Sequence, residues 1–219
     1  MMSPENCTIK GIIFDMDNTL LRSRIDFDSM KRDTYQYLVN AEYLPPNMNL
    51  EHHTTSTIIT LALSTNNMST ESIREMWDIP KKYEVRGMKG ADLEEGVLKL
   101  LDDLRGHYKL AVVTNNAMEA AETALRDHQI LSYFDYVVGR GVMKEIKPSP
   151  DGFLCVLEHF NSTSALEWIS VGDSWIDGKA SANAGIAFIA YNGDTEKMNK
   201  NGVVPFGNIL DIRELKHFL

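Results

Sequence analysis

The chain has 219 residues, and its 22 Lys and Arg against 31 Asp and Glu give a formal net charge of −9. This excess of acid argues against binding to a nucleic-acid backbone as the main function. The apolar fraction of 43% is too high for a disordered chain, and no run of 18 apolar residues predicts a membrane-spanning helix. The length indicates one large domain, or a medium-sized domain that carries an insertion.

The first six residues, Met1-Met2-Ser3-Pro4-Glu5-Asn6, lack the basic segment and apolar segment of a secretory signal. We therefore expect a cytoplasmic protein. The two cysteines, Cys7 and Cys155, have neither CxxC spacing nor a neighbouring His motif, and we expect both to be reduced thiols.

Short apolar runs alternate with segments of helical spacing along most of the chain. The predicted strands are 9–14, 110–114, 136–139, 168–171 and 186–191, and the predicted helices between them include 93–104, 117–126 and 152–160. This alternation is typical of a parallel sheet covered by helices. The sequence therefore predicts the α/β class, with a Rossmann-like, doubly wound parallel sheet.

One stretch interrupts this alternation and contains no convincing strand. Helical patterns cover 26–41 and 54–63, and Ser69 can cap a third helix that continues through Trp77. We predict an inserted all-helical domain over residues 22–86. The catalytic core is then expected to consist of residues 1–21 and 87–219.

Polar residues follow the predicted strands at the edge where their carboxyl ends should meet, which is where open α/β sheets bind ligands. They are Asp15 and Asp17 after the first strand, Thr114 and Asn115 at the second, Lys147 before the helix 152–160, and Asp173 and Asp177 after the fourth strand. Burying several carboxylates together is costly unless a cation accompanies them. The residue set therefore suits Mg²⁺, which prefers oxygen ligands and accepts substrate phosphate oxygens.

The same set indicates the reaction type. A hydroxyl, loop amides and a Lys suit the remaining oxygens of a phosphoryl group. No Ser-His or Cys-His pairing competes for the role of nucleophile, so we expect phosphoryl transfer with an Asp as nucleophile.

Four short motifs in order carry a family resemblance. They are Asp15-Met16-Asp17-Asn18-Thr19, Val112-Val113-Thr114-Asn115, Lys147-Pro148, and Gly172-Asp173 through Asp177. With these motifs at strand ends, the sequence resembles the haloacid dehalogenase superfamily of phosphohydrolases over residues 9–191. The insertion resembles the small helical cap of phosphoglycolate phosphatases and β-phosphoglucomutase.

The resemblance implies a role for each acidic residue. Asp15 would be the nucleophile that forms an aspartyl-phosphate, and Asp17 would protonate the leaving oxygen and then activate water. Mg²⁺ would be held by Asp15, the backbone carbonyl of Asp17 and Asp173. Asp177 would lie behind the metal, where it positions Lys147 or a metal-bound water.

The resemblance also implies a phosphate-binding set. The Thr114 hydroxyl, the backbone N–H of Asn115 and Lys147 would hold the phosphoryl oxygens. Asn18 stands where the family usually has Gly, and we expect its backbone N–H to contact the phosphate all the same.

By resemblance, Asp17 excludes members that cleave carbon–halogen bonds, which lack this acid, and ion-pumping ATPases, which have Thr there. The expected substrate is a small phosphorylated metabolite, hydrolysed as a phosphomonoester. A phosphomutase of the β-phosphoglucomutase type remains an alternative, because the same core residues serve both reactions. A phosphoacceptor receiver module is a second alternative from another class, although it needs an Asp at the end of the third strand, where Val138-Gly139-Arg140 stands.

Two basic residues, Arg22 and Arg24, lie where the chain leaves the first motif for the insertion. We hypothesise that one of them binds a second anionic group of the substrate. The alternative is that both are solvated charges of a connecting segment.

Overall fold

A computed structural model of the protein describes residues 8–219. The expectations for the first six residues and for Cys7 lie outside this part of the chain. The described residues form two compact units, one from residues 8–23 with Ala91–Leu219 and one from Arg24–Gly90. The predicted insertion, residues 22–86, begins two residues before the start of the second unit. It ends four residues before the end of that unit.

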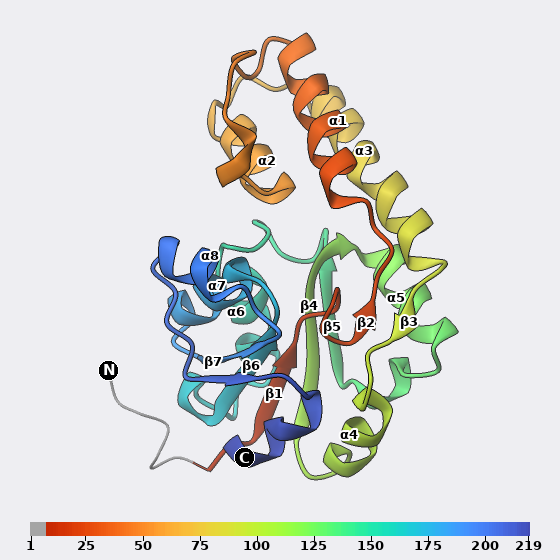
Figure 1. Ribbon diagram of the computed structural model, residues 1–219, viewed down its shortest axis with the longest axis vertical. Coiled ribbons are helices and arrows are strands. Elements are labelled where there is room, and N and C mark those ends of the chain that lie inside the picture. The colour runs from red at the N-terminus through yellow and green to blue at the C-terminus, as the bar shows by residue number, and fades with distance from the viewer. Residues whose placement is uncertain (1–7) are drawn as a thin grey trace. The chain divides into compact units, whose positions relative to one another are not determined.

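The first unit is built on a six-stranded parallel sheet with the order β5-β4-β1-β6-β7-β8 (Figure 1). Its strands are β1 (Gly11–Phe14), β4 (Lys109–Ala117), β5 (Tyr136–Arg140), β6 (Trp168–Gly172), β7 (Ala187–Tyr191) and β8 (Gly207–Ile209). The chain moves outward from β1 to β5 and then returns to the other side of β1 at β6. The carboxyl end of β1 therefore lies at the point where the strand order reverses, which is the usual ligand site of such sheets.

The position of β1 follows from its apolar sequence. All four of its residues are buried, and Ile12 lies between Leu110 on β4 and Ile169 on β6. At Gly11 a Cβ atom would lie 2.4 Å from the ring of Trp168, so only glycine fits beneath this buried ring. Strands buried on both faces need continuous apolar residues, which β1 supplies.

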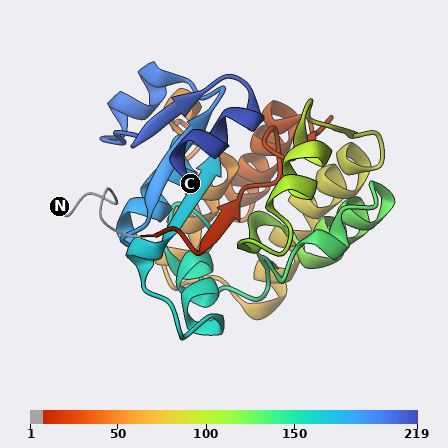
Figure 2. The same ribbon diagram turned by 90° about the horizontal axis from the view of Figure 1, so that it is seen from below.

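Helices cover both faces of this sheet, with α4 and α5 on one side and α6 and α7 on the other (Figures 1 and 2). The helices of this unit are α4 (Val97–Leu104), α5 (Met118–Asp127), α6 (Asp151–His159), α7 (Trp175–Asn183) and α8 (Thr195–Lys200), with the 3₁₀ segments η3 (Leu131–Tyr133), η4 (Ala165–Glu167) and η5 (Ile212–Phe218). Such a distribution follows from right-handed crossovers in both directions from β1. Within residues 8–219, no helix combines the length and the apolar character needed to cross a bilayer.

The sequence did not predict two parts of this unit. The sixth strand, β8, is only three residues long and pairs with β7. The antiparallel pair β2 (Leu21–Arg22) and β3 (Asp92–Leu93) joins the two ends of the connection to the second unit. Strands this short lack a periodic pattern, and their pairing depends on contacts between distant parts of the chain.

The second unit is helical, as predicted. It contains α1 (Phe27–Asn40), the 3₁₀ segment η2 (Leu50–His52), α2 (Thr55–Ser64) and α3 (Thr70–Met88). Ser69 caps α3 by accepting a hydrogen bond from Ser72 N at 3.1 Å, which confirms the predicted start of this helix.

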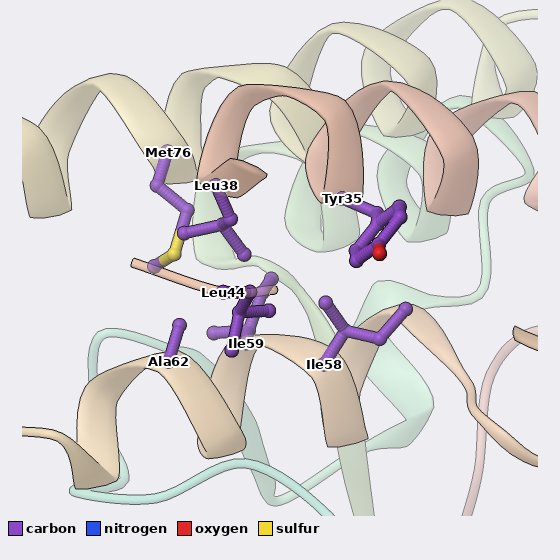
Figure 3. Close-up of a cluster of buried hydrophobic side chains, with 7 residues drawn as sticks. All are labelled: Tyr35, Leu38, Leu44, Ile58, Ile59, Ala62 and Met76. Carbon is purple, nitrogen blue, oxygen red and sulfur yellow. The ribbon is translucent and has the colours of Figure 1, made fainter. Parts of the chain in front are cut away.

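An apolar cluster holds the helices of the second unit together (Figure 3). Its buried members come from all three α-helices and from the segment after α1; they are Tyr35, Leu38, Leu44, Ile58, Ile59, Ala62 and Met76. The Tyr35 hydroxyl donates to Pro45 O at 2.6 Å and accepts from Met48 N at 3.0 Å, so its polar end is satisfied within the cluster.

We expect Ile59→Ala to lower the free energy of unfolding of the helical unit by about 2–5 kcal/mol, because it removes buried methyl groups and leaves a cavity. Ile59 is 1% exposed, whereas Leu61 on the same helix is 41% exposed. Leu61→Ala is therefore the matched control and should change stability much less. Urea denaturation followed by circular dichroism measures both, and equal losses would contradict the proposed core.

Candidate active site

A buried lysine lies at the centre of the acidic residues. Lys147 Nζ is 2.6 Å from Asp15 Oδ1 and 2.6 Å from Asp177 Oδ1, and it donates a hydrogen bond to Val113 O at 2.8 Å. The Lys147 residue is only 1% exposed. The ammonium group is thus compensated by two carboxylates and a carbonyl, as a buried charge requires.

The backbone on either side of this ion pair is held by specific hydrogen bonds. Asp15 directly follows β1, and its N–H donates to Val171 O on β6 at 2.8 Å. The Asn115 side chain brackets Lys147, because its Oδ1 accepts from Lys147 N at 2.8 Å and its Nδ2 donates to Lys147 O at 3.0 Å. The peptide bond between Lys147 and Pro148 is cis.

Three carboxylates come together next to the lysine. Oxygen atoms of Asp15, Asp173 and Asp177 all lie within 4.8 Å of one another. Asp177 Oδ2 accepts from Ser174 N at 3.0 Å at the start of α7, and a Cβ on Gly172 would lie 2.7 Å from this oxygen. Gly172 therefore leaves the space that brings Asp177 against the end of β6.

The electrostatics of the cluster show an excess of negative charge. Burial and the nearby Asp177 raise the pKa of Asp15 to about 6, although Lys147 acts in the opposite direction. Burial, Asp15 and Asp177 likewise raise the pKa of Asp173. Burial lowers the pKa of Lys147, but Asp15 and Asp177 outweigh it, so the pKa is raised and the lysine stays charged.

These residues fit a divalent cation. Three carboxylates with one lysine leave uncompensated negative charge in a buried place, and carboxylate oxygens are ligands for hard cations such as Mg²⁺. Both oxygens of Asp177 already contact protein groups, Lys147 and Ser174. Asp15 and Asp173 are therefore the side chains best suited to hold a metal.

Asp17 lies in a tight turn that follows Asp15. Its Oδ2 accepts a hydrogen bond from Asn116 Nδ2 at 2.8 Å. Asn18 has a φ of 56°, a left-handed conformation that Asn adopts more readily than most residues and that Gly adopts without strain. The Asn18 N–H donates to Leu21 O at 2.7 Å. It is therefore used within the turn, and its contact with a phosphate stays a prediction.

The second motif contributes a buried hydroxyl. Thr114 is 1% exposed, and its Oγ1 accepts a hydrogen bond from Asn116 N at 3.2 Å. The structure thus brings Asn115 and Lys147 together beside Asp15, and Thr114 lies on β4, the strand paired with β1. Asn116 was not among the predicted site residues, and the only signal for it was its place as the third polar residue after an apolar run.

The two arginines have separate locations. Arg22, on β2, forms a bidentate pair with Glu94, with distances of 3.2 Å from Nε to Oε1 and 3.0 Å from Nη2 to Oε2. Glu94 Oε2 also accepts from the Tyr191 hydroxyl at 3.3 Å. Arg24 belongs to the helical unit. The guanidinium of Arg22 therefore has a carboxylate partner of the protein, a contact that the sequence did not indicate.

Comparison with known proteins agrees with this geometry. The family model described as haloacid dehalogenase-like hydrolase matches residues 12–191. The chain belongs to this family. The match includes all four motifs and confirms the family predicted from them.

Curated relatives span most of the chain. The putative pyrophosphatase PpaX of Caldanaerobacter subterraneus is 28% identical over 90% of this chain and 84% of its own length. A phosphoglycolate phosphatase of Vibrio parahaemolyticus is 29% identical over 82% of each chain. The crystal structure of a subfamily IA hydrolase of this superfamily from Geobacter sulfurreducens has 25% identity and a TM-score of 0.64, and it covers 97% of this chain and 100% of its own.

These findings confirm the fold class and the enzyme class, a phosphoric monoester hydrolase of the haloacid dehalogenase type. The family membership sets aside the receiver module. In agreement, β5 ends at Arg140, and no acid occupies the position that such a module requires.

The raised pKa of Asp15 predicts how stability depends on pH in the metal-free protein. The folded state holds the Asp15 proton up to a pH of about 6, whereas the unfolded chain releases it near pH 4. Folded protein therefore binds more protons between these values, and its free energy of unfolding falls as the pH rises from about 4 to about 6. Asp15→Asn removes this titration, so its stability relative to wild type should increase by about 2 kcal/mol over that range.

Thermal or urea unfolding in the presence of EDTA, at pH values from 4 to 7, measures this difference. Asp127→Asn, at an exposed position on α5, is the control and should follow the wild-type curve. Parallel curves for wild type and Asp15→Asn would contradict the prediction.

Proposed function

We propose that the protein is a Mg²⁺-dependent phosphatase that hydrolyses a small phosphomonoester through an aspartyl-phosphate on Asp15. The observation that carries this proposal is the buried contact of Lys147 Nζ with Asp15 and Asp177 at the carboxyl end of β1. It sets a carboxylate and a cation side by side, the two groups needed to attack a phosphoryl group and to stabilise its charge.

Mg²⁺ is the cofactor that the acidic cluster suits best. The side chains of Asp15 and Asp173 and the backbone carbonyl of Asp17 would hold it. The bound ion would neutralise negative charge on the phosphoryl oxygens. Asp177, with its oxygens on Lys147 and Ser174, would keep the lysine in place.

In the first half of the reaction, an oxygen of Asp15 attacks phosphorus and the bond from phosphorus to the leaving oxygen breaks. Asp17 gives a proton to that oxygen, which departs as an alcohol. In the second half, ionised Asp17 takes a proton from water as the water oxygen attacks phosphorus. The bond to Asp15 then breaks, inorganic phosphate is released and the Asp15 carboxylate is restored.

The phosphoryl oxygens would be held by the Thr114 hydroxyl, the backbone N–H of Asn115 and Lys147. Thr114 Oγ1 already accepts a hydrogen bond from Asn116 N, so its own hydrogen is directed elsewhere and can be donated to the substrate. Arg22 would act on a second anionic group only after release from Glu94, and Arg24 is the other candidate for that role.

The relatives support a small phosphate compound as substrate, since their names include a phosphoglycolate phosphatase and a pyrophosphatase. Phosphate release from a panel of phosphorylated metabolites, measured with Mg²⁺, identifies the substrate. Transfer of the phosphoryl group to a sugar phosphate without phosphate release would instead indicate a phosphomutase.

We expect Asp15→Asn to abolish phosphate release, because an amide cannot replace the carboxylate as nucleophile. The measurement is steady-state phosphate release from the best substrate of the panel. Asp78→Asn, which changes an exposed carboxylate of α3 in the same way, should retain wild-type turnover. Normal turnover in Asp15→Asn would refute the assignment of the nucleophile.

Mg²⁺ should stabilise the folded protein because it binds the assembled cluster and not the unfolded chain. At 100 times its dissociation constant the expected gain is about 2.7 kcal/mol. Asp173→Asn should lose most of this gain, whereas Asp78→Asn should keep it. Thermal unfolding over a Mg²⁺ titration measures the effect, and equal stabilisation of both variants would argue against a metal site at Asp173.

A further inference from the structure

Asn116 contacts two groups of the proposed mechanism from one buried position. It lies near the end of β4 and is 5% exposed. Its side-chain Nδ2 donates to Asp17 Oδ2 at 2.8 Å, across 99 residues of sequence, and its backbone N donates to Thr114 Oγ1 at 3.2 Å. Neither contact is predicted by the four motifs.

We propose that Asn116 is a positioning residue that makes Asp17 transfer its proton from Oδ1. This inference rests on the proposed function and deepens it. An amide nitrogen only donates hydrogen bonds, so Asp17 Oδ2 must keep a lone pair toward Asn116. An accepted hydrogen bond lowers the basicity of Oδ2, so the proton of the acid form favours Oδ1 of Asp17.

The same atom, Oδ1 of Asp17, transfers the proton in both half-reactions. Asp17 Oδ1 gives its proton to the leaving oxygen as the phosphorus–oxygen bond breaks, and the electron pair of that bond stays on the leaving oxygen. In the second half, Oδ1 takes a proton from the attacking water. The hydrogen bond from Asn116 to Oδ2 persists throughout and prevents the carboxyl group from rotating.

A neutral amide suits this position better than a charged side chain. A carboxylate at residue 116 would repel Asp17 in a region that already contains Asp15 and Asp173. A cation would hold Asp17 in its ionised form and oppose its role as an acid. The amide orients Asp17 by hydrogen bonding alone and leaves the charge of the cluster unchanged.

The test compares two esters that differ in their need for an acid. One is the best alkyl phosphate of the metabolite panel, beginning with phosphoglycolate, whose alkoxide leaving group requires protonation. The other is p-nitrophenyl phosphate, whose phenolate leaves readily without it. Because kcat/KM includes only the steps up to formation of the aspartyl-phosphate, it isolates the acid step from the later activation of water.

We expect Asn116→Ala to lower kcat/KM for the alkyl phosphate by about 10–100-fold, part of the 10²–10⁴ that a positioned acid contributes. The kcat/KM for p-nitrophenyl phosphate should change by less than about 3-fold. Asn116→Leu keeps a similar volume but loses the donor without adding a charge, so it should show the same selective loss. Asn208→Ala, at an exposed position on β8, is the control and should match wild type with both esters.

A double-mutant cycle links the effect to Asp17. Asp17→Asn should show the same selective loss, and adding Asn116→Ala to it should cause no further loss with the alkyl phosphate. Equal losses for both esters, or additive losses in the double variant, would overturn the role of Asn116 and leave the phosphatase intact. Phosphate release that survives Asp15→Asn would instead overturn the proposed function, and the role of Asn116 with it.

Discussion

The buried contact of Lys147 with Asp15 and Asp177 is the interaction on which the site depends. Each of the three charged groups would be costly to bury alone. Together they are satisfied because Lys147 Nζ lies 2.6 Å from an oxygen of each carboxylate, which requires three separate chain segments to meet. Asp15 and Lys147 are 132 residues apart in sequence. The sheet, the Asn115 side chain and the start of α7 all serve to bring these segments together.

The net charge of the cluster explains why this arrangement suits phosphoryl transfer. Two carboxylates compensate the lysine and a third remains, while burial and the neighbouring carboxylates raise the pKa of Asp15 and of Asp173. A divalent cation would remove that excess and attract an anionic substrate to an otherwise acidic protein. The repulsion among the buried carboxylates would thus be offset when a metal ion binds among them.

The polar residues around the site divide into those that contact a substrate and those that orient them. In our proposal the Thr114 hydroxyl and the Asn115 N–H contact the substrate, whereas the side chains of Asn115 and Asn116 orient Lys147 and Asp17. Asn18 stabilises the turn between Asp17 and β2 through its left-handed backbone. Adjacent residues of one segment therefore have different roles. The hydrogen-bond partners of each side chain determine its role.

The sequence by itself determined the α/β class, the strand that carries Asp15, the helical insertion and the family, because apolar periodicity and motif order are local properties of the chain. Only the tertiary structure decided which short strands pair, namely β8 with β7 and β2 with β3. It also decided three polar contacts: the partner of Arg22, the use of the Asn18 N–H within its turn, and the contact of Asn116 with Asp17. Each of these depends on which atoms meet across long stretches of chain, and one-dimensional spacing does not encode such distances. The physical reason is that buried polar groups are satisfied by partners that folding selects from anywhere in the sequence.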